Sequence, residues 1–258
     1  MAPDSAVQVV RLRIEKSEIS LVGARETNQD RIACLMNGSS AFVVVCDGMG
    51  GHRAGEQAAE VAGRALCERY RSAEQPLLDP LGFLHLAVGA AHAQVVNFGA
   101  DTPLETRPRA TCAVLLVQDD AAYWAHVGDS RVYHLRDGAV LTRTRDHSHV
   151  ELLLREGLIA RDQMQAHPMR NFVESCLGGE PLLPEMTLSG RNALHAGDRL
   201  LVCTDGLWGN VSDEQIASAL VAPDQRLSDS MYQLARRAVE AGGPTADNTS
   251  AVVLRCLE

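Results

Sequence analysis

Four aspartates stand at the ends of strongly apolar segments, and three of them have a glycine as a neighbour. They are Asp47 after the run 42–46, Asp129 after 124–128, Asp205 after 200–204 and Asp247 before 249–254. A strand that is buried on both faces cannot hide a carboxylate, so the strand ends collect negative charge at one edge of a sheet. Such a cluster requires cations, and oxygen ligands of this kind suit Mg²⁺ or Mn²⁺. The pattern therefore predicts an enzyme whose active site is built from metal-binding carboxylates.

Length and charge limit the classes of protein to be considered. The chain has 258 residues, of which 46% are hydrophobic, and we expect one domain over residues 1–258. The net charge of −9 argues against a nucleic-acid partner. The first residues lack the basic and apolar regions of a secretory signal, and no apolar run reaches the about 18 residues that suggest a membrane span. We therefore expect a soluble cytoplasmic protein without a membrane span.

Cysteine and lysine usage excludes three classes of enzyme. None of the seven cysteines is followed by arginine six positions later, as the Cys-x5-Arg loop of thiol phosphatases requires. Several cysteines stand in apolar runs and none forms a Cys-x-x-Cys pair, so we expect structural thiols. Lys16 is the single lysine, whereas P-loop and protein-kinase chemistry each need a lysine on the nucleotide phosphates.

The spacing of apolar residues predicts an α+β fold with segregated strands and helices. The expected strands are 10–14, 42–46, an antiparallel meander of four runs within 111–144, 182–188, 199–204 and 249–256. The expected helices are 54–70, 77–95 and 227–240, with shorter pieces over 150–156 and 161–166. The last two pieces lie in the segment 146–179, which we expect to project from the sheet as a small flap subdomain.

Seven short motifs follow one another along the chain. They are 25–30 (RETNQD), 45–52 (VCDGMGGH), 128–131 (GDSR), 144–148 (TRDHS), 167–171 (HPMRN), 204–207 (TDGL) and 247–249 (DNT). With these motifs in this order, the chain resembles the metal-dependent PP2C-type (PPM) serine/threonine protein phosphatases, particularly the bacterial ones. That resemblance implies an αββα sandwich, two antiparallel β-sheets flanked by helices, with the metals at one end.

The resemblance also implies a set of metal ligands. They are Asp30, Asp47, the backbone carbonyl of Gly48, Asp129, Asp205 and Asp247. Asp47 would bridge two Mn²⁺ or Mg²⁺ ions, and Asp129 with Asp205 matches a third, weaker metal site. A hydroxide held between two divalent ions would attack phosphorus in line, without a covalent enzyme intermediate.

Three further residues receive roles from the same resemblance. Arg25 matches the phosphate-binding arginine, whose planar fork suits a phosphoryl group, and Gln29 and Asn248 would support the site. The resemblance implies that the enzyme hydrolyses phosphoserine and phosphothreonine in proteins that a cognate kinase has phosphorylated. It also implies a role in signalling. We expect the enzyme to act as a monomer.

The chain departs from the family pattern at two positions. Many members have glutamate where this chain has Gln29, so we expect the second metal to bind more weakly. Eukaryotic members carry a histidine, proposed as general acid, where this chain has Met49. His52 is the nearest substitute for that proton donor.

Other readings of the same residues remain open. The aspartates could be turn residues, and His126, inside an apolar run, is expected to be a hydrogen-bonded core residue. A regulator of the same fold could bind phosphoproteins with weak or no catalysis. A di-metal phosphodiesterase would also use clustered aspartates, although the acidic composition argues against a nuclease.

Overall fold

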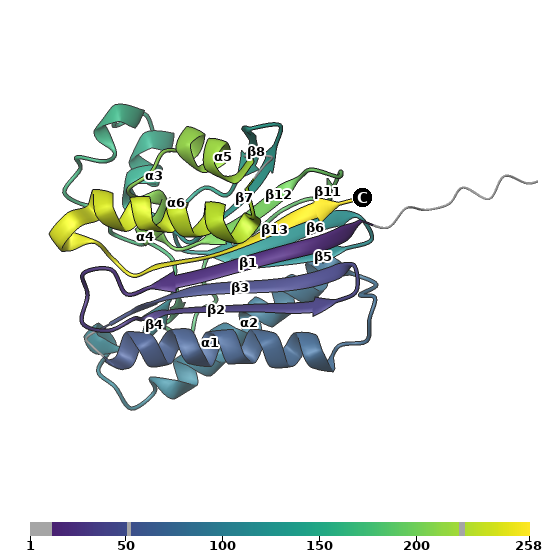
Figure 1. Ribbon diagram of the computed structural model, residues 1–258. Helices are drawn as coiled ribbons and strands as arrows, with labels where there is room; N and C mark the ends of the chain where they lie inside the picture. The colour runs from purple at the N-terminus through teal and green to yellow at the C-terminus, as the bar shows by residue number, and fades with distance from the viewer. Residues whose placement is uncertain (1–11, 51–52, 222–224) are drawn as a thin grey trace, which may run out of the picture.

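Two antiparallel β-sheets lie face to face with helices on their outer faces (Figure 1). The computed structural model describes residues 12–50, 53–221 and 225–258. One sheet has the strand order β1-β13-β12-β7-β8, and the other has the order β10-β6-β5-β3-β4-β9, with β2 paired to β3 and β11 to β6. This αββα arrangement confirms the predicted fold class.

The strands and helices have the following bounds. The strands are β1 (Arg13–Leu21), β2 (Asp30–Asn37), β3 (Ser40–Met49), β4 (Arg109–Ala110), β5 (Cys112–Gln118), β6 (Ala121–Val127), β7 (Arg131–Arg136), β8 (Ala139–Arg143), β9 (Leu177–Gly178), β10 (Thr187–Leu188), β11 (Asn192–Ala193), β12 (Arg199–Cys203) and β13 (Thr249–Leu257). The α-helices are α1 (Arg53–Ser72), α2 (Pro80–Phe98), α3 (His149–Arg155), α4 (Asp205–Trp208), α5 (Asp213–Val221) and α6 (Leu227–Gly242). Short 3₁₀ turns are η1 (Leu104–Thr106), η2 (Arg161–Gln163) and η3 (Gly243–Thr245).

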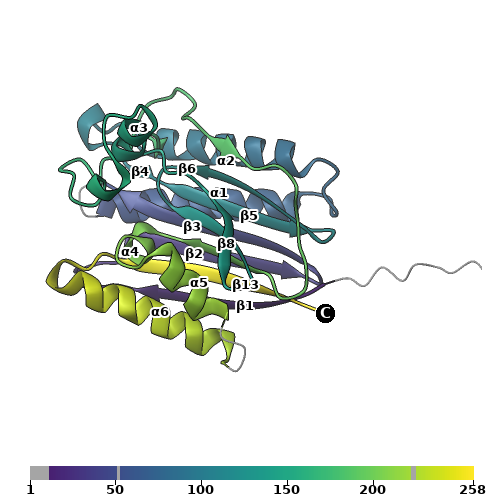
Figure 2. The ribbon, with the colours of Figure 1, turned by 90° about the horizontal axis from the view of Figure 1, so that it is seen from above.

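The alternation of side chains along β3 divides the interior into layers. Phe42 and Val44 point to the layer beneath α1 and α2, whereas Val43 and Val45 pack between the sheets. A third cluster lies beneath α5 and α6 and includes Leu201 of β12. Figure 2 shows α1 and α2 on one side of the sandwich and α5 and α6 on the other. β3 is therefore buried on both faces, as its continuous apolar sequence predicts.

The connection between β6 and β7 passes from one sheet to the other. β6 pairs with β5, whereas β7 pairs with β12, so Gly128, Asp129 and Ser130 span the gap between the sheets. The segment 111–144 is therefore two hairpins in different sheets, and the prediction of one continuous meander was wrong. The φ of +97° at Gly128 and its contact with Thr111 leave no room for a side chain at this crossing.

Some of the other predicted helices and strands are confirmed and others are not. The expected helices over 54–70, 77–95 and 227–240 are confirmed by α1, α2 and α6. The expected strand over 182–188 reduces to Thr187–Leu188, because Pro181 and Pro184 interrupt strand pairing. The sequence reading missed β2 and α5. The strand expected over 10–14 begins at Arg13 among the described residues.

The helix α2 is long and apolar enough, by length and composition, to cross a membrane, and it is the one such helix in the described part of the chain. Leu84, Val88 and Val95 of α2 are fully buried in the cluster that α1 shares. Asp79 accepts a hydrogen bond from the backbone of Gly82 and caps the start of the helix. One face of α2 therefore packs in the core.

Candidate active site

The ends of several strands bring carboxylates together at one end of the sandwich. Asp30 begins β2, and Asp47 lies near the end of β3. Asp205 follows β12 as the first residue of α4, Asp247 precedes β13, and Asp129 lies in the crossing from β6 to β7. Both sheets therefore contribute acidic residues to the same end of the fold.

Asp30 and Asp47 face each other across a strand pair. They are direct partners in the antiparallel register of β2 and β3, which places their Cα atoms about 4.5 to 5.5 Å apart. Like charges at directly opposed positions destabilise a strand pair. The sheet therefore holds two carboxylates where a counter-cation would relieve their repulsion.

Burial raises the pKa of three of these carboxylates. Burial, and then the charges of Asp30 and Asp205, raise the pKa of Asp47 well above its usual range. Burial raises the pKa of Asp30 to about 6, although hydrogen bonds from Ser250 and Thr204 oppose the shift. Burial, followed by the charges of Asp129 and Asp247, raises the pKa of Asp205 well above its usual range.

The donor set fits a hard divalent cation. Oδ2 of Asp30 accepts a hydrogen bond from the Thr204 hydroxyl at 2.9 Å, but its Oδ1 is buried without a hydrogen-bond partner. A buried carboxylate oxygen without a partner is a place where a cation or a water molecule can bind. No three His, Cys, Asp or Glu side chains within the described ranges already converge as a ready ligand set. The backbone thus brings the carboxylates to one end, and side-chain rotation would have to close them around an ion.

Two glycines permit close approaches between segments of the site. A Cβ at Gly48 would collide with the carbonyl oxygen of Gly55 in α1. A Cβ at Gly206 would collide with the carbonyl oxygen of Asn248. Glycine after Asp47 and after Asp205 therefore has a packing reason in addition to any role toward a ligand.

Arg25 lies against the same cluster. Its guanidinium donates to Oδ2 of Asp247 at 2.6 Å, and 57% of its side chain is exposed. Asn248 anchors the loop that carries Arg25, because its side-chain amide donates to the carbonyls of Val22 and Thr27 at 2.8 and 3.0 Å. Its Oδ1 accepts from the backbone N–H of Gln29 at 2.8 Å.

Hydroxyl groups connect Asp47 with the crossing between the sheets. The Thr111 hydroxyl accepts from the backbone N–H of Asp47 at 3.1 Å and lies 2.7 Å from the Ser130 hydroxyl. Burial, and then the charge of Asp146, raise the pKa of Asp129 to about 7. Sequence reasoning assigned no role to Thr111.

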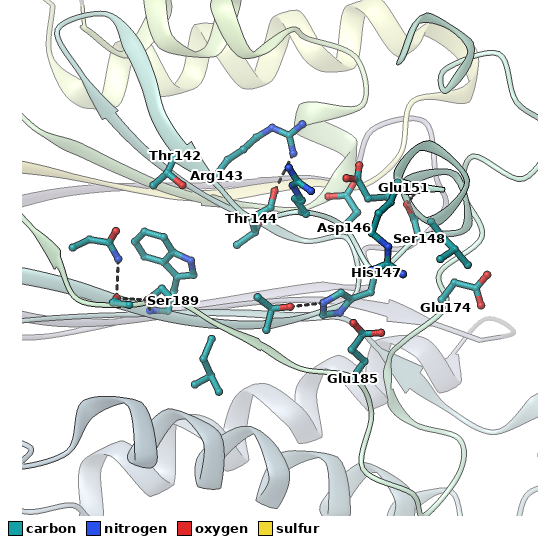
Figure 3. A pocket seen from close by; sticks show the side chains of 18 residues that line it. Thr142, Arg143, Thr144, Asp146, His147, Ser148, Glu151, Glu174, Glu185 and Ser189 are labelled. Atoms are coloured by element: carbon teal, nitrogen blue, oxygen red, sulfur yellow. Dashed lines mark hydrogen bonds between the residues drawn. The ribbon is translucent and has the colours of Figure 1, made fainter. Parts of the chain in front are cut away.

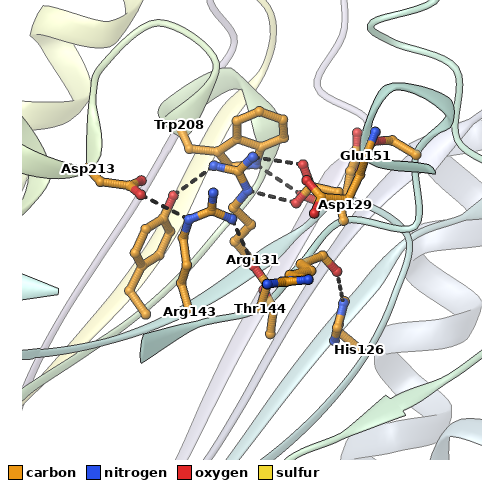
Figure 4. A network of polar contacts seen from close by, with 12 residues as sticks. His126, Asp129, Arg131, Arg143, Thr144, Glu151, Trp208 and Asp213 are labelled. Atoms are coloured by element: carbon orange, nitrogen blue, oxygen red, sulfur yellow. Dashed lines mark hydrogen bonds and ion pairs between the residues drawn. The ribbon is translucent and has the colours of Figure 1, made fainter. Parts of the chain in front are cut away.

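A buried network of polar contacts surrounds Asp129 (Figure 4). Arg131 donates from Nε and one Nη to the two oxygens of Asp146, each at 2.7 Å. Trp208 donates from its indole N–H to the backbone carbonyl of Asp129 at 3.0 Å. Arg131 and Asp146 belong to motifs that the sequence displays, but their pairing depends on tertiary contacts.

His126 is a hydrogen-bonded core residue, as expected. Its side chain is fully buried, Nε2 donates to the carbonyl of Arg145 at 2.7 Å, and its ring stacks on His147 with centroids 4.5 Å apart. Burial, and then the charge of His147, lower the pKa of His126 to about 4. His147 accepts a hydrogen bond from the backbone N–H of Gly128 at 3.2 Å and so supports the crossing between the sheets.

A pocket of about 440 Å³ is lined by residues of β8, α3 and β10 (Figure 3). Its lining includes Asp146, His147 and Glu151. None of the implied metal ligands in the described part of the chain lines it. The carboxylate end, where the buried charges are, remains the better candidate for chemistry.

The segment 146–179 contains α3, η2 and β9. It is attached to one sheet through the ion pair of Asp146 with Arg131 of β7, and to the other through β9. The backbone N–H of His147 donates to the carbonyl of Gly128 at 2.9 Å, and β9 pairs with β4. The candidate proton donor His52 lies outside the described residues, whereas Met49 is the half-buried last residue of β3.

Comparison with known proteins identifies relatives over nearly the whole chain. The profile described as protein phosphatase 2C matches residues 21–246. The serine/threonine protein phosphatase PstP of Mycobacterium tuberculosis is 34% identical over 229 residues, which cover 89% of this chain. The protein phosphatase PhpP of Streptococcus pneumoniae is 32% identical over 234 residues, which cover 88% of this chain and 93% of PhpP.

A solved structure resembles the whole sandwich. The catalytic domain of PstP in complex with 2 manganese ions superposes with a TM-score of 0.79 and 31% identity, covering 96% of this chain and 100% of that domain. The present chain spans 42% of the length of M. tuberculosis PstP, so the match to that relative concerns one part of it.

Proposed function

We propose that this chain, which belongs to the protein phosphatase 2C family, is a metal-dependent phosphatase that hydrolyses phosphoserine and phosphothreonine in proteins. The observation that carries the proposal is the meeting of carboxylates from both sheets at one end of the sandwich, where Asp30 and Asp129 are buried and Asp47, Asp205 and Asp247 are half-buried. Asp30 and Asp47 oppose each other in register, and burial raises the pKa of Asp47, Asp129 and Asp205. Buried carboxylates that repel one another are what a divalent-cation site requires.

Each ligand has a proposed place in that site. Asp47 would lie between two Mn²⁺ or Mg²⁺ ions, with Asp205 and Asp247 on one side and the Gly48 carbonyl and Asp30 on the other. Asp129 would share a third, weaker ion with Asp205. When bound, such ions supply Lewis-acid activation of water and neutralise charge on the phosphoryl group. The buried Oδ1 of Asp30, which has no hydrogen-bond partner, supports the inclusion of Asp30 among the metal ligands.

Arg25 is the proposed phosphate-binding residue. Its guanidinium is largely exposed and lies at the edge of the carboxylate cluster through its 2.6 Å contact with Asp247. A planar guanidinium can donate two parallel hydrogen bonds to phosphoryl oxygens. Arg25 would therefore share or exchange its contact with Asp247 when the phosphoryl group binds. Asn248, through its hold on the loop, and Gln29 are proposed to support this arrangement.

The departing serine or threonine oxygen must gain a proton, because an alkoxide is a poor leaving group. We propose His52 as the donor, on its position in the sequence five residues after Asp47. We also propose that the substrates are proteins phosphorylated by a cognate serine/threonine kinase, and that the enzyme acts in the cytoplasm as a monomer. The names of PstP and PhpP support the protein substrate class.

The direct test is phosphatase activity with its metal dependence. With Mn²⁺ the purified protein should hydrolyse p-nitrophenyl phosphate and phosphothreonine peptides, and excess EDTA should abolish both activities. Asp47→Asn should lower turnover at least about a thousandfold, because it weakens the ligand proposed to lie between two ions. Asp101→Asn, a matched change at an exposed turn after α2, should leave turnover unchanged.

Two results would contradict the proposal. One is full activity in excess chelator, and the other is wild-type turnover in Asp47→Asn. Faster hydrolysis of bis(p-nitrophenyl) phosphate than of phosphopeptides would instead favour a phosphodiesterase. Binding of phosphopeptides by the metal-loaded protein without turnover would favour a phosphoprotein-binding regulator.

A further inference from the structure

Arg131 is held from three directions beside the candidate site (Figure 4). Its Nε and one Nη donate to both oxygens of Asp146 at 2.7 Å, and its other Nη donates to the Tyr133 hydroxyl at 3.0 Å. The side chains of Arg131 and Asp146 are only 9% and 3% exposed. A bidentate pair with this burial fixes both the position and the plane of the guanidinium.

The plane of that guanidinium lies against Trp208. The guanidinium carbon is 3.4 Å from the centroid of the Trp208 ring, within the range of a cation–π contact. The indole N–H donates to the backbone carbonyl of Asp129 at 3.0 Å. The same ring is thus fixed by stacking on its face and by a hydrogen bond at its edge.

Trp208 also belongs to the helix that carries a second carboxylate. It is the last residue of α4, and Asp205 is the first. Residues three apart on a helix lie on the same face, about one turn from each other. The indole therefore connects the backbone of Asp129, in the crossing between the sheets, with the helix that begins at Asp205.

This connection opposes the electrostatic repulsion between the carboxylates of Asp129 and Asp205. Asp129 and Asp205 both carry carboxylates, and the contact of Trp208 with the Asp129 carbonyl brings the two segments together. Two carboxylates that repel each other separate unless the segments that carry them are held. Hydrogen bonding and stacking through Trp208 hold those two segments.

We propose that Trp208, fixed by Arg131 and Asp146, is a positioning residue that keeps Asp129 and Asp205 at the separation a shared divalent cation needs. We call Arg131, Asp146 and Trp208 the clamp. The inference rests on the proposed metal-dependent function and deepens it. It states that residues other than the ligands determine how tightly the cation shared by Asp129 and Asp205 binds. The cation proposed to be held by Asp47, Asp205 and Asp247 shares only Asp205 with the clamp, so the clamp should affect its affinity much less.

The first test is stepwise Mn²⁺ binding, measured by isothermal titration calorimetry on the full chain. Trp208→Phe keeps a ring for Arg131 but removes the hydrogen bond to Asp129. It should weaken the weakest Mn²⁺ step about fivefold, the value of one hydrogen bond, and affect the tighter steps much less. Trp124→Phe changes the only other tryptophan, which lies on β6, and should titrate as the wild type does.

A second variant and a second signal guard against a general loss of structure. Arg131→Lys retains a charge near Asp146 but loses the planar stack, and it should weaken the same Mn²⁺ step. In Trp124→Phe protein, Trp208 is the sole tryptophan, so its emission should change over the Mn²⁺ concentrations that fill the weakest step. Thermal unfolding of each variant establishes that the folded protein is being titrated.

The outcomes separate the clamp from the proposed function. Identical Mn²⁺ steps in Trp208→Phe and wild type, or equal weakening of every step, would overturn the clamp alone if the wild type binds Mn²⁺ and hydrolyses phosphopeptides. A wild type that binds no Mn²⁺ and hydrolyses no phosphopeptide would overturn the proposed function, and the clamp with it. Selective weakening of the weakest step in both variants would support the clamp.

Discussion

In the presence of chelator, Asp129→Asn should stabilise the fold at pH 8, and the gain should shrink as the pH falls. Burial, and then the charge of Asp146, raise the pKa of Asp129 from 3.8 to about 7. A carboxyl whose pKa is raised in the folded state binds its proton more tightly there than in the unfolded chain. Its contribution to stability is therefore complete below about pH 4 and is lost as the pH rises through about 7.

The magnitude follows from the size of the shift. A difference of about 3 pH units corresponds to about 4 kcal/mol at pH 8, because each unit is worth about 1.4 kcal/mol. The cost falls below about 1 kcal/mol near pH 4, where the folded-state carboxyl is protonated. Asparagine has the same shape and no charge, so Asp129→Asn should recover most of the loss at pH 8.

Urea unfolding followed by circular dichroism, in EDTA at several values between pH 4 and pH 8, measures the effect. Asp101→Asn, at an exposed position, is the matched control and should show no such trend. Saturating Mn²⁺ should reduce or reverse the advantage of Asp129→Asn, because the ion stabilises the wild type by binding to it. If the variant is no more stable than the wild type at pH 8, or if its advantage is independent of pH, the reasoning is wrong.

Three further predictions concern buried and candidate catalytic residues. Cys46→Ala should cost about 1 to 3 kcal/mol of stability from a small cavity yet retain phosphatase activity, because burial keeps the thiol pKa well above its usual range; a well-folded but inactive variant would contradict this. His126, whose pKa burial lowers to about 4, should make unfolding easier as the pH falls from about 6.5 to about 4, by up to about 3 kcal/mol. His126→Gln should remove that dependence in urea titrations, and an unchanged pH profile would argue against it. His52→Ala should lower phosphopeptide turnover about ten- to a hundredfold and barely affect p-nitrophenyl phosphate, whose leaving group needs no proton; equal losses on both substrates would make His52 a structural residue.

The sequence was sufficient to predict the strand ends that carry the acidic residues. Continuous apolar runs identified β3, β12 and β13, and the aspartates next to them could be placed at strand ends without knowledge of the pairing. The register that sets Asp30 opposite Asp47 could not be predicted, because β2 itself was missed. The five consecutive apolar residues from Ile32 to Met36 are a signal that could have identified β2, whereas its pairing partner could not be read from them.

Local composition also gave wrong or incomplete predictions where tertiary contacts determine the structure. Leu182 and Leu183 suggested a strand, but their side chains are largely exposed, and the neighbouring prolines cannot pair. The partners of Arg131 could not be read from the sequence, since Asp146 lies 15 positions away and Trp208 belongs to another segment. The spacing of residues within one motif does not reveal which other motif lies against that motif in the folded protein.

The passage of the chain from β6 in one sheet to β7 in the other has a consequence for how the protein becomes active. One layer of the sandwich supplies Asp30 and Asp47, the other supplies Asp205 and Asp247, and Asp129 lies on the crossing. Neither layer alone contains a complete set of these residues. Assembly of the site and docking of the two layers are then the same event, so recovery of metal binding during refolding would time the closure of the sandwich.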